Sequence, residues 1–122
     1  MSGSSVFPVH EMAITQGIVD ICLQHAGGRT VRQVVIEIGD LSGVVPEAVA
    51  FCFTACTADT TAAEARLEIR QIQGAGRCLD CGTEQSLARL YDPCRQCGGY
   101  ALTLLRGEEL RVVELEVDDE QY

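Results

Sequence analysis

Two matched pairs of cysteines constrain the fold of this chain more than any other feature. They follow the pattern C-x2-C-x12-C-x2-C and are Cys78, Cys81, Cys94 and Cys97. Because two residues separate the members of a pair, both sulfurs of one tight turn can face a single point, and two turns supply the corners of a tetrahedron. Gly82 and Gly98 follow the pairs, where a tight turn needs a positive φ. The motif predicts a metal-binding ribbon of short β-hairpins.

Four thiolates around one ion leave no open coordination position, so we expect a structural and not a catalytic metal site. Zn(II) is the first choice of metal, and iron is the main competitor because a tetrahedron of four sulfurs also suits it. A segment of about 30 residues buries too little apolar surface to fold alone, so the metal would supply its folding energy. Four free thiols or two disulfides are the alternative interpretation.

The cysteine count and the start of the chain favour a reducing compartment. The first nine residues, MSGSSVFPV, contain no basic segment and no long apolar stretch, so they do not resemble a secretory signal. Seven cysteines fit poorly with a fully paired disulfide framework. We therefore expect a cytoplasmic protein, whose cysteines bind metals or pack in the core. The other three cysteines are interpreted as core residues of helices; they are Cys22, Cys52 and Cys56.

The hydrophobic pattern outside the ribbon predicts an α+β fold. Predicted helices cover residues 11–24 and 47–57, and predicted strands cover 30–38, 65–72, 101–105 and 109–117. In the first helix, one buried stripe is expected to hold Ile14, Ile18, Ile21, Cys22 and His25. The last strand is expected to return to the sheet made by the first two. The expected fold is two helices packed on a small, about three-stranded sheet, with an inserted four-cysteine zinc ribbon.

This pattern divides the chain into four segments. Residues 1–9 are interpreted as a flexible N-terminal extension, and residues 119–122 as an acidic tail. Residues 10–73 plus 107–118 form the predicted α/β domain, and residues 74–106 form the predicted zinc-ribbon domain. The run Gly74-Ala75-Gly76, where the composition changes, is interpreted as a hinge.

The charge balance argues against a nucleic-acid partner. Nine Lys+Arg, all of them arginine, stand against 18 Asp+Glu, which gives a formal net charge of −9; phosphate binding instead needs clustered cations. No apolar run reaches about 18 residues, so no membrane-spanning helix is expected. The chain has no activated nucleophile constellation, and we expect it not to be an enzyme. The alternatives are a zinc-ribbon adaptor or nucleic-acid-binding module, and a small iron-containing redox protein.

The two histidines lie at opposite ends of the first predicted helix. His25 is interpreted as a cation that interacts with the carboxyl end of that helix. His10 lies beside Glu11 just before the helix begins, where backbone amides are not consumed by helical hydrogen bonds. Taken alone, His10 would be an ordinary solvated residue.

Three segments that follow one another along the chain resemble a known family, and this resemblance changes the interpretation of His10. They are His10-Glu11-Met12-Ala13-Ile14, the segment Ile38-Gly39-Asp40-Leu41-Ser42-Gly43-Val44, and the paired C-x2-C motifs. Together they resemble the HypA/HybF family of hydrogenase-maturation nickel metallochaperones, from His10 to about Val117. The cysteine pairs alone occur in many zinc ribbons, whereas their combination with an N-terminal His-Glu pair is far more specific.

The resemblance implies a function and partners. In that family Ni(II) is bound transiently near the amino terminus by the histidine imidazole and backbone nitrogens, and the glutamate is accessory; the matching residues are His10 and Glu11. The structural zinc ligands match Cys78, Cys81, Cys94 and Cys97. The implied partners are a nickel-handling GTPase of the maturation pathway and the hydrogenase large subunit, and a homodimer is compatible with the sequence.

The position of His10 departs from the family pattern. Family members begin Met-His-Glu, whereas nine residues precede His10 here. A translation start at Val9, read as Met, would make His10 the second residue and bring the α-amine within reach of the metal. Asp40 is a further candidate ligand near this site.

Overall fold

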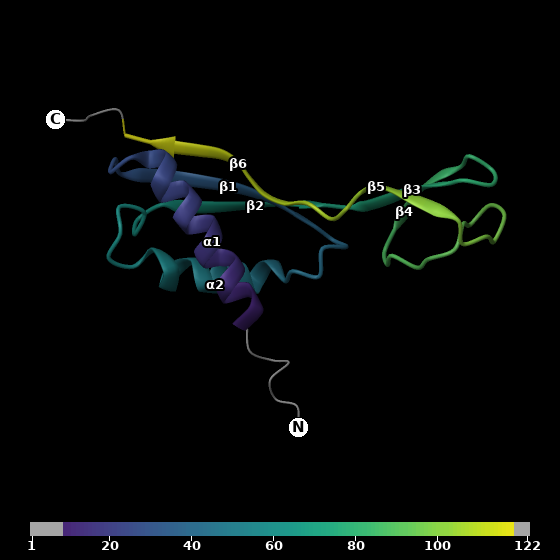
Figure 1. Cartoon of the computed structure of the whole chain (residues 1–122), viewed down its shortest axis with the longest axis horizontal. Helices are drawn as coiled ribbons and strands as arrows, with labels where there is room; N and C mark the ends of the chain where they lie inside the picture. Colours follow the sequence, from purple (N-terminus) through teal and green to yellow (C-terminus); the bar gives the residue numbers. More distant parts are fainter. Residues whose placement is uncertain (1–8, 119–122) are drawn as a thin grey trace, which may run out of the picture. The chain divides into compact units, whose positions relative to one another are not determined.

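The computed structural model describes residues 9–118. Residues 1–8 of the predicted extension and the predicted acidic tail at 119–122 lie outside the described residues. The helices and strands in Figure 1 are α1 (Val9–Ala26), β1 (Val31–Gly39), α2 (Pro46–Thr57), β2 (Arg66–Ile72), β3 (Gly74–Cys78), β4 (Glu84–Leu87), β5 (Leu102–Arg106) and β6 (Leu110–Val117). The expected α+β fold, with two helices, a three-stranded sheet and a four-cysteine ribbon, is confirmed.

The first sheet has the strand order β2-β1-β6, so β1 is its central strand. At the start of β1, the Asp118 N–H donates to the Thr30 carbonyl at 2.9 Å. At its end, the Gly39 N–H donates to the Glu109 carbonyl at 2.8 Å. β6 therefore runs antiparallel to β1, and the last strand returns to the first sheet as the sequence predicts.

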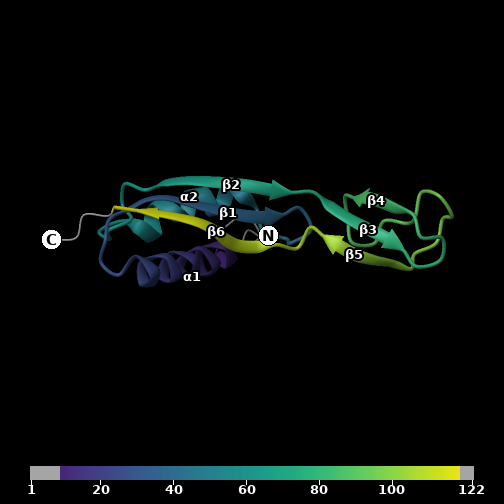
Figure 2. The same ribbon diagram turned by 90° about the horizontal axis from the view of Figure 1, so that it is seen from above.

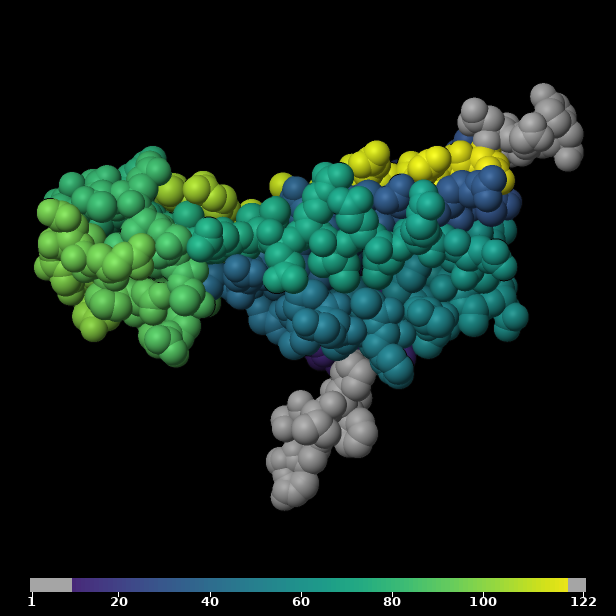
Figure 3. Space-filling view, turned by 180° about the vertical axis from the view of Figure 1, so that it is seen from behind, coloured from purple at the N-terminus to yellow at the C-terminus, as the bar shows by residue number. Residues whose placement is uncertain are grey.

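Both helices cover the same face of this sheet (Figure 1, Figure 2). Val34, Ile36 and Ile38 alternate along β1 and are at most 1% exposed, because a strand turns every second side chain to the same face. α2 adds five buried residues, which are Val49, Cys52, Phe53, Cys56 and Thr57. The opposite surface of α2, in blue-teal in Figure 3, faces solvent.

The buried stripe of α1 differs from the predicted one. The buried residues are Glu11, Thr15, Ile18, Val19, Cys22 and Ala26. Ile21 is 50% exposed and His25 is exposed, so their assignment to the buried stripe is wrong. Spacings of three and four residues fit more than one stripe on a helix, and the stripe that packs includes two polar residues that hydrophobicity does not mark.

The second sheet has the strand order β4-β3-β5, and β3 is antiparallel to both neighbours. Gly74-Ala75-Gly76 lies within β3, so the interpretation of this run as a hinge is wrong. The glycines provide space: a Cβ at Gly76 would lie 2.8 Å from the Leu87 Cδ1, and one at Gly74 would lie 2.6 Å from the Leu87 carbonyl oxygen. A glycine inside a strand commonly marks such a close approach.

The chain forms two compact units. Among the described residues, one unit contains 9–36, 45–69 and 111–118 and holds both helices. The other contains Glu37–Val44 and Arg70–Leu110, and it holds the second sheet and the four paired cysteines. No helix in the described range 9–118 is both long enough and apolar enough to cross a membrane.

Candidate metal centres

The structure brings the four paired cysteines together in the second unit. All four sulfurs lie within 4.8 Å of one another, and they belong to Cys78, Cys81, Cys94 and Cys97. The Sγ atoms of Cys78 and Cys97 are 3.6 Å apart, as are those of Cys81 and Cys94. A regular tetrahedron with metal–sulfur distances of about 2.3 Å has sulfur–sulfur edges of about 3.8 Å. These spacings fit one shared ion and are far longer than the ~2.05 Å of a disulfide.

Each cysteine pair sits in a tight turn closed by a backbone hydrogen bond. The Gly82 N–H donates to the Cys78 carbonyl, and the Gly98 N–H donates to the Cys94 carbonyl, both at 2.8 Å. The φ angles of these glycines are +79° and +76°, a conformation that glycine adopts without a steric penalty. The matched turns direct both sulfurs of each pair toward one centre, as the spacing predicts.

The thiols of this cluster differ in acidity. Hydrogen bonds with Thr83 lower the pKa of Cys81 to about 6. A backbone hydrogen bond at Gly99 lowers the pKa of Cys97, but the neighbouring thiols outweigh it and raise that pKa to about 12. Four adjacent thiolates repel one another, so they need a cation to be ionised together. The donor set therefore suits a metal ion that binds four thiolates.

The start of α1 presents a second and different candidate site. α1 begins at Val9, so His10 lies in the first turn of the helix, and the prediction that it precedes the helix is wrong. Its side chain is exposed, and the first N–H groups of a helix have no partner within the helix. An exposed imidazole beside unused backbone nitrogens is an accessible, nitrogen-rich donor set.

The neighbouring Glu11 has a different environment. Its side chain is buried at 9% exposure, and its Oε2 accepts a hydrogen bond of 3.4 Å from the Val45 N–H. Val45 is the N-cap of α2 and has no side-chain cap, and the next residue, Pro46, has no N–H. The Glu11 carboxylate thus fixes the start of α1 against the start of α2, where the helix dipole favours negative charge.

The remaining cysteines lie in the helical core, as their helical positions predict. Cys22, Cys52 and Cys56 are each at most 7% exposed. Burial raises the pKa of all three thiols. The Cys56 thiol also lies 3.5 Å from the Met12 Sδ on α1, a contact between helices that neither helical pattern reveals. Asp40, a further candidate ligand, lies in the turn after β1 with its side chain exposed.

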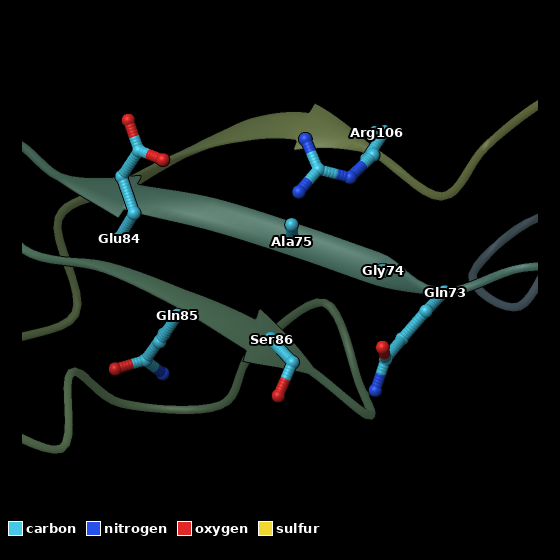
Figure 4. A pocket seen from close by; sticks show the side chains of 7 residues that line it. All are labelled: Gln73, Gly74, Ala75, Glu84, Gln85, Ser86 and Arg106. Atoms are coloured by element: carbon cyan, nitrogen blue, oxygen red, sulfur yellow. The ribbon is translucent and has the colours of Figure 1, made fainter.

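A polar hollow of about 250 Å³ lies on the second sheet, and Figure 4 shows the side chains that line it. Arg106 on β5 extends above Ala75 of β3, and Glu84 of β4 points to the same side (Figure 4). Arg77 forms an ion pair with Glu84. The residues lining the hollow include no cysteine or histidine, so it offers none of the soft donors found at the cysteine cluster.

The chain is similar to known proteins over most of its length. Residues 9–117 match the family described as "Hydrogenase/urease nickel incorporation, metallochaperone, hypA". The chain is 59% identical to the hydrogenase maturation factor HypA of Geotalea uraniireducens (strain Rf4), over 90% of this chain and 100% of that protein. It is 54% identical to the HypA of Geobacter metallireducens, with the same coverage.

The fold resembles that of solved structures. The solution structure of the Ni metallochaperone HypA from Helicobacter pylori aligns with a TM-score of 0.62 and 22% identity, over 90% of this chain and 98% of that one. A second solution structure, of a HypA protein, aligns with a TM-score of 0.64 over 91% of this chain. The matched family range and the identity to its members show that this chain belongs to the HypA family of hydrogenase/urease nickel-incorporation metallochaperones.

Proposed function

We propose that this protein binds one Ni(II) ion at His10 and delivers it to the large-subunit precursor of a nickel–iron hydrogenase. Residues 10–73 plus 107–118 handle nickel in this proposal, and residues 74–106 hold a structural Zn(II) ion. The observation that carries the proposal is the exposed His10 in the first turn of α1, at the point where the family match begins.

The chemistry of the His10 environment supports nickel. An imidazole combined with deprotonated backbone nitrogens forms a planar, nitrogen-rich ligand set, which suits Ni(II) or Cu(II). An exposed site at a helix start also allows the ion to be handed on. Glu11 is an accessory residue, since its carboxylate is directed to the Val45 N–H and orients the helix that carries His10.

Calorimetric nickel titration with paired histidine variants tests the site. We expect His10→Ala to weaken Ni(II) binding at least tenfold, because it removes the imidazole nitrogen ligand at the helix start. His25→Ala is the matched control: His25 is the other exposed histidine, in the last turn of the same helix. Equal nickel affinity in the wild-type protein and His10→Ala would reject the assignment.

The start of the chain is tested in the same titration. A protein that begins at residue 9, with Met in place of Val9, would place the α-amine next to His10, where it can act as a further nitrogen donor. We expect this form to bind Ni(II) more tightly than the 122-residue chain. Equal affinity would show that the α-amine does not contribute to the site.

The four-cysteine cluster is proposed to hold Zn(II). Sulfur spacings of 3.6 Å and the closed ligand set support a permanent structural ion. Elemental analysis of purified protein should give one zinc per chain, and Cys94→Ser should lose it. Cys22→Ser, a change at a buried cysteine on α1, should keep the zinc. A coloured protein that contains iron would overturn the assignment of the metal.

Nickel delivery is tested by transfer. Radioactive ⁶³Ni loaded on the wild-type protein should appear in the hydrogenase large-subunit precursor, and a nickel-handling GTPase of the pathway should accelerate the transfer. His10→Ala should transfer no nickel above the level of free ion. Transfer by that variant at the wild-type rate would contradict delivery from His10.

A cytoplasmic location and a homodimer stay predictions of the sequence.

A further inference from the structure

The surface between α1 and α2 contains sulfur groups that the proposed nickel and zinc sites do not use. The Met12 thioether on α1 and the Cys56 thiol on α2 are 3.5 Å apart. Cys52 precedes Cys56 by one helical turn, and residues four apart lie on the same face of a helix with their Cβ atoms about 5–6 Å apart. Three sulfur donors from two helices therefore face one region of the helix interface.

We propose that Met12, Cys52 and Cys56 form a Cu(I) site between α1 and α2, separate from the His10 nickel donors. Thiolate and thioether are soft ligands and select Cu(I) over harder ions. The site is enclosed yet reachable, since Cys52 and Cys56 are 0% and 7% exposed while Met12 is 37% exposed. Copper would enter past the Met12 side chain.

The surroundings of the sulfurs favour a cation. The Glu11 carboxylate acts electrostatically on Cys52, and the Asp20 carboxylate acts on Cys56. Neither α1 nor α2 contains a lysine or an arginine. A thiolate here would therefore be stabilised by a bound positive ion and not by a basic side chain.

Copper binding at this site needs no oxidant or reductant, and its protons and charges can be accounted for. Copper arrives as Cu(I) in a soluble complex and keeps its +1 charge. Each cysteine that binds the ion releases its thiol proton to the buffer, and Met12 binds through a sulfur lone pair. With both cysteines bound as thiolates and Met12 as a neutral thioether, the Cu(I) complex carries a net charge of −1. The preference for Cu(I) over a divalent ion therefore rests on the soft thiolate and thioether donors and not on charge neutrality.

Competition with bicinchoninate tests the site in the full zinc-loaded chain. Under anaerobic conditions, the protein should remove one Cu(I) per chain from the coloured bicinchoninate complex while its zinc content stays constant. Met12→Leu conserves volume and removes the thioether, so we expect Cu(I) affinity to fall at least tenfold. Cys22→Ser, at a buried cysteine elsewhere on α1, and His10→Ala should bind Cu(I) like the wild type.

Methionine NMR gives a second measurement that does not depend on affinity. The chain has two methionines, Met1 and Met12. With ¹³C-methyl labelling, one equivalent of Cu(I) should shift the Met12 resonance, which Met12→Leu identifies by its loss. Three outcomes would overturn the site: zinc release in step with copper uptake, equal affinity in Met12→Leu and wild type, or loss of Cu(I) binding in His10→Ala. The last would place copper at the proposed nickel donors, whose own role is tested separately by nickel titration.

Discussion

His10 and Glu11 are adjacent in sequence, yet the fold gives their side chains opposite environments. Successive residues of a helix point about 100° apart, so α1 exposes His10 and buries Glu11. The imidazole is therefore accessible to an ion and to an acceptor protein. The carboxylate instead accepts the Val45 N–H at the start of α2. The accessory role proposed for Glu11 is best explained by orientation of the helix that carries His10.

Removal of the Glu11 carboxylate should destabilise the helix pair. We expect Glu11→Ala to lower the free energy of unfolding by about 1–2 kcal/mol, because the Val45 N–H loses a charged acceptor. Glu11→Gln keeps a carbonyl oxygen in place and should lose less. Urea denaturation of the three proteins measures the difference. Glu47→Ala, at an exposed position in the first turn of α2, should stay within about 0.5 kcal/mol of wild type; an unaltered Glu11→Ala would refute this role.

At the scale of the elements, strand ends meet at glycines that leave no room for a side chain. A Cβ at Gly39, the last residue of β1, would lie 2.0 Å from the Gly107 carbonyl oxygen. The Leu41 N–H donates to that same oxygen at 2.7 Å. Because the clash is with backbone that is held by a hydrogen bond, no side-chain rotation can relieve it.

Two glycine-to-alanine variants should therefore change the stability of the protein in opposite directions. Gly39→Ala should destabilise the protein by about 2–4 kcal/mol, since the backbone of β1 must move away from Gly107. Gly17 lies on the exposed side of α1, and a Cβ there meets no atom within 4 Å. Gly17→Ala should stabilise the helix by about 0.5–1 kcal/mol. Thermal denaturation that ranked Gly39→Ala at or above wild type would contradict the close approach.

The elements that were predictable from the sequence are those with a regular hydrophobic period. Helix α2 and strands β1, β2 and β6 occur within two residues of their predicted bounds, because burial on one face imposes that period. Short hairpins were predicted for the ribbon, but the bounds of β3 and β4 were not, since Gly74-Ala75-Gly76 and Glu84–Leu87 have no alternating apolar pattern. Their pairing depends on close approach of backbones, which is a property of the assembled sheet.

The same distinction applies to the candidate sites. The cysteine cluster was predictable because two short turns fix all four sulfurs locally. The hydrogen-bond partner of Glu11 was not predictable, since Val45 lies 34 residues further along the chain and donates through its backbone. The Met12–Cys56 contact is likewise the product of helix packing. Backbone donors and contacts across a helix interface leave no pattern in one sequence.

At the scale of the whole molecule, ligand chemistry can sort metals between sites. Four clustered sulfurs suit a permanent tetrahedral ion, whereas the exposed His10 suits an ion that leaves. Sorting of this kind requires that the other three thiols do not compete with these two sites for their metal ions. Burial limits their competition for Ni(II) and Zn(II), because it raises the pKa of Cys22, Cys52 and Cys56 and lowers their thiolate population.

Counting the reactive thiols in the native, metal-free and denatured protein should distinguish the metal-binding cysteines from the buried ones. In the native, zinc-loaded protein we expect no cysteine to react rapidly with Ellman's reagent, since a bound metal protects four sulfurs and burial protects three. Removal of the metal with a strong chelator should make four cysteines reactive, and denaturant should then expose all seven. Cys22→Ser should lower only the final count. A fast-reacting thiol in the native zinc-loaded protein would contradict either the closed metal site or the burial of the helical cysteines, and mass mapping of the labelled residue would show which one fails.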